Sequence, residues 1–149
     1  MDIDTILDYK SNCGDERIMN FPSENECLKL LQSLGVSRNI VLHPTEVAKI
    51  AVLITGHLIS RGWHINLGLV MAAGLLHDIA KGTIKHAQRG QKIVSELGYD
   101  AVADMIASHM DLPSHMITTI NEAGIIYLAD KIVNGSRALS LWKKGLVTH

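Results

Sequence analysis

The sequence predicts an all-α fold, a single compact bundle of about five to seven helices. Apolar residues recur at helical intervals along most of the chain, whereas the alternating pattern typical of strands is almost absent. The chain has 149 residues, of which 47% are hydrophobic, so it can bury one sizeable core. We expect residues 21–149 to form this helical domain and residues 1–20 to be an N-terminal arm or a frayed segment.

The first two helices are predicted from the signals at their ends. Ser23 and Glu26 have the spacing of a capping box, and the apolar repeat that follows them stops at Gly35. Pro44 suits the first turn of a second, longer helix. In that arrangement His43 would be the N-cap of the second helix.

A third helix is predicted after Asn66, which is a suitable N-cap residue. Its apolar run, VMAAGLL, is followed without a polar transition by His77 and Asp78. Core packing alone would not place two metal-ligand types of side chain at the end of a buried helix. Adjacent helical residues point about 100° apart, so these two can share a metal ion only if other helices supply further ligands.

The remaining helices are predicted from three further patterns. One begins near His86, and Asp100 would cap the next, which Pro113 would end. The last pattern covers residues 122–134 and is followed, after a glycine, by a shorter helical tail to Trp142.

Composition narrows the choice of partners and location. The chain has 14 Lys plus Arg against 15 Asp plus Glu, so no global positive field attracts polymeric nucleic acid or an acidic membrane. Cys13 and Cys27 lack the spacing of a disulfide framework or a zinc knuckle. The N-terminus is acidic where a signal peptide is basic, and the apolar runs fall short of the roughly 20 residues of a membrane span. We expect a cytoplasmic protein, and the sequence leaves its oligomeric state open.

The histidines direct the search for a site. The chain has eight of them, an excess that is notable because imidazole is a common metal ligand and fills a core poorly. An isolated buried histidine is more often a hydrogen-bonded core residue, however, and Asp130 could form a buried salt bridge. Asp130 shares its helix face with apolar residues, where a carboxylate without a cation is unfavourable. As a helix cap, His43 would stay neutral beside the positive end of the helix dipole, which is the form that binds metal.

These residues carry a resemblance to a known family. His43, the His77-Asp78 pair within LLHDIAK, and Asp130 within YLADKIV resemble the H…HD…D signature of HD-domain phosphohydrolases. The similarity covers residues 43–137. It implies an all-helical fold in which the four residues bind a divalent metal ion that activates water for attack on phosphorus.

The resemblance extends to a second ion. His86, within KHAQRGQKIV, and His109, within IASHMDL, lie at places like those of two extra histidines in some branches of the family, where the Asp of the doublet, here Asp78, bridges two ions. One similar branch hydrolyses symmetrical dinucleoside tetraphosphates, and Arg137 matches its last motif position, although SHMDLPSH replaces its H-T-T-G run. HD segments fused to nucleotidyltransferase-like domains of molybdenum-cofactor proteins look equally similar.

Positions along the chain suggest roles for basic residues, and the ligand types suggest a type of cofactor. Asp78 and Lys81 would be catalytic, and Lys81, Lys131 and Arg137 would bind the phosphates of a small substrate, a nucleotide being favoured. Lys81, one turn beyond the doublet, could equally be a solvated lysine. Mixed imidazole and carboxylate ligands suit one or two divalent transition-metal ions, namely Fe, Mn, Co, Ni or Zn. Two alternatives stay open: a metal-containing nucleotide-binding module without turnover, and a helical protein whose histidines lie in a core without metal.

Overall fold

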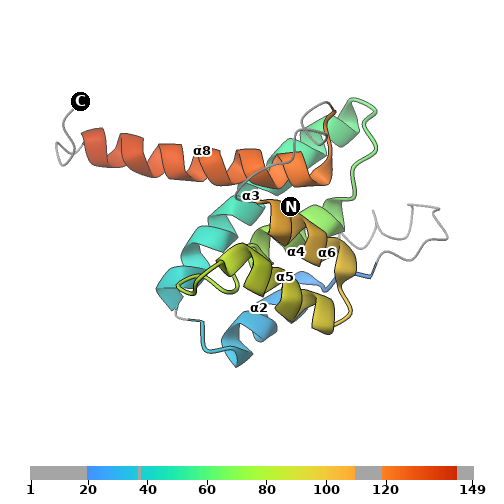
Figure 1. The fold of residues 1–149 in the computed structure, drawn as a ribbon. Coiled ribbons are helices and arrows are strands. Elements are labelled where there is room, and N and C mark those ends of the chain that lie inside the picture. The colour runs from blue at the N-terminus through green and yellow to red at the C-terminus, as the bar shows by residue number, and fades with distance from the viewer. Residues whose placement is uncertain (1–19, 37, 110–118, 144–149) are drawn as a thin grey trace.

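The computed structural model describes residues 20–36, 38–109 and 119–143, without the side chains of residues 38–40 and 135–143. These ranges contain helices and no strand, so the predicted all-α fold is confirmed (Figure 1). The six helices of this part of the chain are α2 (Glu24–Ser33), α3 (Arg38–Ser60), α4 (Leu67–Leu76), α5 (His86–Glu96), α6 (Asp100–Ser108) and α8 (Glu122–Lys143).

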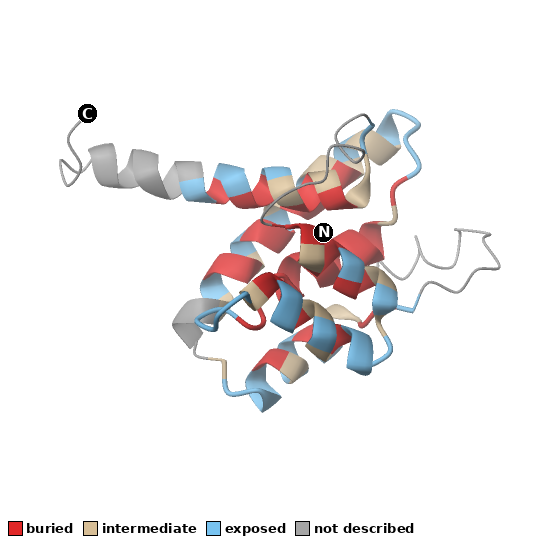
Figure 2. Cartoon of the chain, viewed as in Figure 1, coloured by how far each residue is buried: buried red, intermediate tan, exposed pale blue. Residues whose placement is uncertain are grey.

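Helix α4 forms the centre of the bundle. All ten of its residues are buried, and it contacts α2, α3, α6 and α8. A helix that is apolar on every side must be surrounded by other elements, and the buried residues of the neighbouring helices turn toward it (Figure 2). Asn66 is its N-cap, as predicted, because the side-chain oxygen accepts a hydrogen bond of 3.0 Å from the amide of Leu69.

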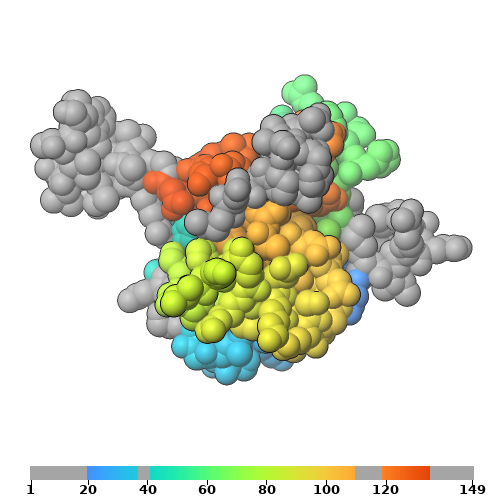
Figure 3. Space-filling view, viewed as in Figure 1, coloured from blue at the N-terminus to red at the C-terminus, as the bar shows by residue number. Residues whose placement is uncertain are grey.

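The other helices pack around α4 in pairs. The two long helices α3 and α8 lie against each other, and α5 and α6 pair to form one face of the molecule (Figure 3). Helices α3 and α4 approach very closely, since a Cβ atom on Gly74 would lie 2.8 Å from the Cα atom of Ala48. None of the helices in the described ranges is long and apolar enough to cross a membrane.

The capping box of α2 forms as predicted. The hydroxyl of Ser23 accepts a hydrogen bond of 3.2 Å from the amide of Glu26, and the Glu26 carboxylate accepts one of 3.5 Å from the amide of Ser23. Gly35 follows the helix with a φ of 71°, a left-handed conformation that glycine adopts without steric cost.

The predicted start of α3 is wrong. The helix begins at Arg38, so Pro44 lies inside it and His43 is not an N-cap. Val41 packs against the core, which extends the buried stripe of the helix toward its N-terminus. Proline removes one backbone donor from this turn, while the hydroxyl of Thr45 donates a hydrogen bond of 2.8 Å to the carbonyl of Val41. Tertiary packing therefore overrides the preference of proline for a first turn.

Two further helix boundaries differ from the predictions. Asp100 is the first residue of α6 rather than its cap, and its carboxylate accepts a hydrogen bond of 2.8 Å from the hydroxyl of Ser95. Helix α8 continues past residue 135 to Lys143 without the predicted interruption, because one glycine costs a helix only about 1 kcal/mol. Pro113 and residues 1–19 of the predicted arm over residues 1–20 lie outside the described residues.

Candidate metal centre

Six polar side chains meet beyond the C-terminal end of α4. They come from the interior of α3, the turn after α4, the first residue of α5, the end of α6 and the middle of α8. Five of the residues are buried, and the sixth, on α5, has a side chain that is 27% exposed. The six are His43, His77, Asp78, His86, His109 and Asp130. The structure thus brings together all six residues that the sequence suggested as metal ligands.

Asp78 lies between two sets of imidazoles. Its Oδ2 atom is 3.3 Å from Nε2 of His77 and 3.7 Å from Nε2 of His43. Its Oδ1 atom is 3.4 Å from Nε2 of His109 and 3.9 Å from Nε2 of His86. The two oxygens of one carboxylate therefore face two different groups of potential ligands.

Asp130 completes the first of these groups. Its Oδ1 atom is 2.8 Å from Nε2 of His43 and 3.6 Å from Nε2 of His77. The two imidazole rings lie 5.5 Å apart between centroids, at an interplanar angle of 61°. Among the described residues no arginine or lysine pairs with Asp130, so its neighbours are histidines.

Two backbone hydrogen bonds fix which ring nitrogens face the centre. Nδ1 of His77 lies 2.7 Å from the carbonyl oxygen of Gly74, and Nδ1 of His109 lies 2.7 Å from that of Ile106. A carbonyl oxygen only accepts, so Nδ1 carries a proton and donates in both rings. In a neutral ring Nε2 then carries a lone pair, and in both histidines this Nε2 atom faces carboxylate oxygens. Both Nε2 atoms are buried without a hydrogen-bond partner, so the centre requires a positive charge between the imidazoles and the carboxylates.

The pKa values show how the protein groups share this charge. Burial acts to lower the pKa of His77, but the carboxylates of Asp130 and Asp78 outweigh it and raise the pKa to about 9. Burial lowers the pKa of His43, and the hydrogen bond to Asp130 opposes this only in part. The neutral form expected for His43 is thus favoured by burial, not by a helix end. A buried ion pair with Asp130 would need the charged form of His43, which burial disfavours.

Both carboxylates are held in the ionised form. Burial would raise the pKa of Asp78, but the imidazoles of His109 and His77 outweigh it and keep the pKa well below its usual range. Burial likewise opposes ionisation of Asp130, and His77 and His43 together lower its pKa. The centre therefore offers two anionic ligands to a cation.

The six residues divide into two groups, in each of which the potential ligand atoms lie within 4.8 Å of one another. One group is His43, His77 and Asp130, and the other is Asp78, His86 and His109. Imidazole nitrogens together with carboxylate oxygens suit a divalent transition metal. The buried Nε2 atoms of His77 and His109 fit such an ion, which would replace the proton that the carboxylates favour on His77. The identity of the metal does not follow from this donor set.

The predicted phosphate-binding residues differ in their placement. Nζ of Lys81 is 3.8 Å from Oδ2 of Asp78, and its side chain is 52% exposed, so it lies at the edge of the centre. Lys131 is exposed, and its Nζ lies 5.1 Å from the centroid of the Tyr127 ring instead of beside the carboxylates. The side chain of Arg137 is outside the described residues.

Sequence reasoning missed the backbone groups that orient the site. The carbonyls of Gly74 and Ile106 belong to the last turns of α4 and α6, and that of Ile106 also accepts a hydrogen bond of 3.3 Å from the amide of His109. A histidine just after a predicted helix end could have indicated these hydrogen bonds, because its ring can reach the carbonyls of the last helical turn. Such outer hydrogen bonds set the tautomer and the ring orientation of metal-binding histidines.

An all-helical bundle with a buried histidine and carboxylate centre defines a class of protein, one that can bind divalent cations. The model of the HD domain family matches residues 40–135, and the chain belongs to this family. HD domains bind divalent metals, and the proteins of this family are generally metal-dependent phosphohydrolases. The family match supports the resemblance seen in the sequence at the level of the superfamily.

A second comparison finds a relative in an archaeon. The chain is 33% identical over 85 residues to an uncharacterized protein of Methanocaldococcus jannaschii. The aligned region covers 55% of this chain and 50% of that protein, so the chain spans about half the length of its relative. No solved structure matches the chain.

Proposed function

We propose that this protein is a metal-dependent phosphohydrolase that cleaves a phosphoester or phosphoanhydride bond of a small, nucleotide-like molecule. The observation that supports this proposal most strongly is the position of Asp78, whose two oxygens lie 3.3–3.9 Å from Nε2 atoms of two separate sets of imidazoles. A carboxylate in this position suits a ligand shared by two cations. Membership of the HD domain family supports the same activity.

The first group of residues would hold one ion. His43 and His77 contribute Nε2 atoms, and Asp130 contributes the oxygen that faces both of them. The carbonyl of Gly74 keeps the proton of His77 on Nδ1, so Nε2 remains a ligand atom. Helices α3 and α8, together with the end of α4, thereby fix this group from three sides.

The second group would hold another ion and leave one side open. Asp78 is shared, His109 is oriented by the carbonyl of Ile106, and His86 is partly exposed at the start of α5. Divalent ions here would neutralise phosphate oxygens and lower the pKa of a bound water toward neutrality. Because His86 is the exposed member, we infer that substrate enters between α5 and the turn that carries Asp78.

Lys81 would assist at that entrance. Its ammonium lies 3.8 Å from Oδ2 of Asp78 on a half-exposed side chain, so it can reach a phosphate oxygen without being buried. Lys131 and Arg137 remain weaker candidates for binding the distal part of a substrate. A nucleotide is favoured because a polyphosphate offers several oxygens to two cations and a lysine. The branch that hydrolyses symmetrical dinucleoside tetraphosphates gives the first compounds to test.

The test is turnover across nucleotide phosphates, dinucleoside polyphosphates and a generic phosphodiester, with Mn²⁺ and Fe²⁺ supplied separately. The wild type should hydrolyse at least one compound, and Asp78→Asn should lower kcat by about a hundredfold or more, since it weakens a ligand shared by both ions. Asp104→Asn removes an exposed carboxylate on α6 and should retain full activity. If wild type and Asp78→Asn are equally inert on the whole panel, the enzyme proposal fails and a metal-binding module without turnover replaces it.

A further inference from the structure

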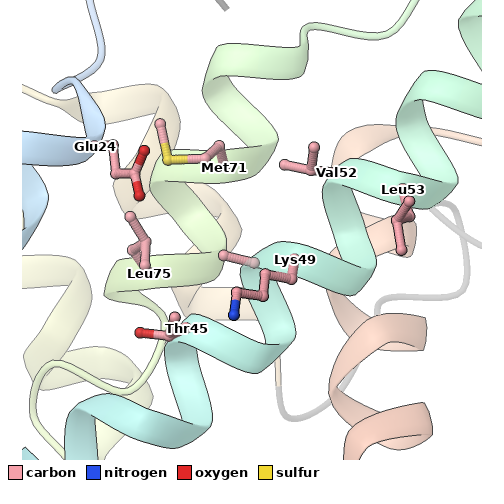
Figure 4. A pocket seen from close by; sticks show the side chains of 8 residues that line it. Glu24, Thr45, Lys49, Val52, Leu53, Met71 and Leu75 are labelled. Carbon is pink, nitrogen blue, oxygen red and sulfur yellow. The ribbon is translucent and has the colours of Figure 1, made fainter. Parts of the chain in front are cut away.

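A pocket of about 340 Å³ opens between α2, α3 and α4 (Figure 4). This volume is at the lower end of the range for pockets that bind small molecules. The pocket is lined by Glu24, Thr45, Ala48, Lys49, Val52, Leu53, Met71 and Leu75. None of these residues belongs to the metal centre.

The pocket and the metal centre lie on opposite faces of the same two helices. Thr45 follows His43 by two positions in α3, and Leu75 precedes His77 by two positions at the end of α4. Two positions in a helix correspond to about 200° of rotation, so each pocket residue points away from the neighbouring ligand. The pocket is therefore a separate site and not an extension of the metal centre.

The floor of the pocket is apolar and held in shape by the core. Ala48 and Val52 on α3, and Met71 and Leu75 on α4, are each no more than 7% exposed. The close backbone contact of α3 and α4 at Gly74 fixes the distance between these two walls. At the rim Leu53 is 68% exposed. A ligand with an apolar body would cover the floor and part of this residue.

Two opposite charges flank this apolar floor. Glu24 lies on the α2 side, next to Met71 and above Leu75, and Lys49 lies on the α3 side in Figure 4. They form no salt bridge with each other or with any other residue of the described part. Among the lining residues Lys49 is the one cation and Glu24 the one anion, while the hydroxyl of Thr45 donates to a backbone carbonyl.

We propose that this pocket binds a small zwitterionic molecule whose apolar chain separates an ammonium group from a carboxylate. The ammonium would pair with Glu24, the carboxylate with Lys49, and the chain would lie on the apolar floor. Lys49 is exposed and Glu24 is partly exposed, so each pair resembles a surface ion pair, and a ligand with both charges should bind about two- to fivefold more tightly than one with a single charge. This proposal is independent of the phosphohydrolase proposal.

The probes are ω-amino carboxylates of increasing length: 4-aminobutanoate, 6-aminohexanoate and 8-aminooctanoate. Binding to the full chain is followed by NMR as shifts of the methyl signals of Val52, Leu53, Met71 and Leu75. At least one length should saturate these shifts, and hexanoate and hexylamine, which carry one charge each, should bind about two- to fivefold more weakly. No saturable shift with any length, or equal binding of hexanoate, hexylamine and 6-aminohexanoate, would overturn the proposal.

Variants distinguish recognition of the two charges from nonspecific hydrophobic binding. Glu24→Gln and Lys49→Gln should each weaken binding of the best probe by about two- to fivefold, whereas Glu46→Gln and Lys29→Gln, at exposed positions outside the pocket, should not. The double variant Glu24→Lys/Lys49→Glu reverses the charges and should restore binding with the probe turned around. Far-UV circular dichroism checks that each variant is folded. Equal affinity in Glu24→Gln, Lys49→Gln and wild type would contradict the proposal.

Discussion

His77 and His109 show how a helix end can prepare a ligand. Each residue directly follows the last residue of a helix. Its Nδ1–H group donates a hydrogen bond to the backbone carbonyl three residues earlier. This hydrogen bond satisfies a carbonyl of the last turn and turns Nε2 toward the carboxylates. Ring orientation is thus set by the backbone before any ion binds.

Lys81 is the residue whose role is most directly testable at the edge of the centre. Replacing it with alanine removes an ammonium that lies 3.8 Å from Asp78, so kcat/KM for a phosphorylated substrate should fall by about tenfold or more. Lys81→Arg should recover part of the loss, because it keeps the charge. Lys92→Ala, at an exposed position on α5, is the matched control in the same steady-state assay. Equal kcat/KM values for Lys81→Ala and Lys92→Ala would remove Lys81 from the mechanism.

Cys27 gives a prediction of pH dependence. Burial, with smaller contributions from the charges of Glu26 and Glu24, raises the pKa of this fully buried thiol from 9.0 to about 12. Because the folded value is above the unfolded one, the stabilising effect is complete below pH 9 and is lost as the pH rises toward 12. The free energy of unfolding should therefore fall with pH in this window by up to about 1.4 kcal/mol per pH unit.

The measurement is urea unfolding at pH 8 and pH 10.5, with Cys13→Ser as the common background. The background protein should lose more stability over this interval than Cys13→Ser/Cys27→Ala, in which the buried thiol is absent. Subtracting the two slopes removes the contribution of every other titrating group. Parallel slopes would mean that the Cys27 thiol titrates alike in the folded and the unfolded chain.

At the scale of the elements, the crossing of α3 and α4 determines the geometry of both sites. Helix α3 carries His43 on one face and Lys49 on another, and α4 ends at His77. The helices meet where Gly74 leaves room for Ala48, and a Cβ atom there would lie 2.8 Å from the Ala48 backbone. Since that neighbour is backbone, it cannot move aside as a flexible side chain would.

Gly74→Ala should therefore destabilise the protein even though alanine is the better helix former. Overpacking of a well-packed core costs typically 1–3 kcal/mol, more than the roughly 1 kcal/mol that alanine gains over glycine in a helix. The control is Gly124→Ala in α8, where the nearest atom to the added Cβ is a side-chain oxygen at 3.4 Å. Chemical denaturation should show a lower midpoint for Gly74→Ala and a midpoint at or above that of the wild type for Gly124→Ala. A midpoint for Gly74→Ala at or above that of the wild type would show that the two backbones can separate at low cost.

Local sequence signals predicted the helix ends correctly where an interaction within the same segment determines the boundary. The Ser23 capping box, the Asn66 cap and the buried run of α4 depend on neighbours within four residues, and all three are present in the structure. The start of α3 could not be predicted from Pro44, because the burial of Val41 against distant helices outweighs the local preference. Asp100 differs for the same kind of reason, since Ser95 binds the carboxylate that would have capped α6.

At the scale of the whole molecule, the six site residues could be named from sequence but not their arrangement. The motif indicated which histidines and carboxylates to consider, since ligand-type residues in apolar helices are costly without a cation. The division into two groups, with Asp78 between them, depends on how α3, α5, α6 and α8 pack around the end of α4. Nor could the pocket on the far side of α3 and α4 be inferred, because it is a product of that same packing.

The centre joins residues that are far apart in the chain, so ions bound there should stabilise the entire fold. His43 and Asp130 are 87 positions apart, and both face the same group. An ion that binds the folded chain and not the unfolded one adds about 2.7 kcal/mol at a concentration of one hundred times its Kd. Adding Mn²⁺ or Zn²⁺ to chelator-treated protein should therefore raise Tm by several degrees, and EDTA should reverse the change.

Two variants show whether this stabilisation comes from the proposed ligands. Asp78→Asn should reduce the metal-dependent rise in Tm strongly, since both groups lose a shared anionic ligand. His64→Ala removes an exposed imidazole that lies outside the cluster and should leave the rise unchanged. Differential scanning fluorimetry at several metal concentrations gives the rise for each protein, and metal analysis gives the stoichiometry. A rise that is equal in Asp78→Asn and wild type, or that disappears in His64→Ala, would place the ions elsewhere on the molecule.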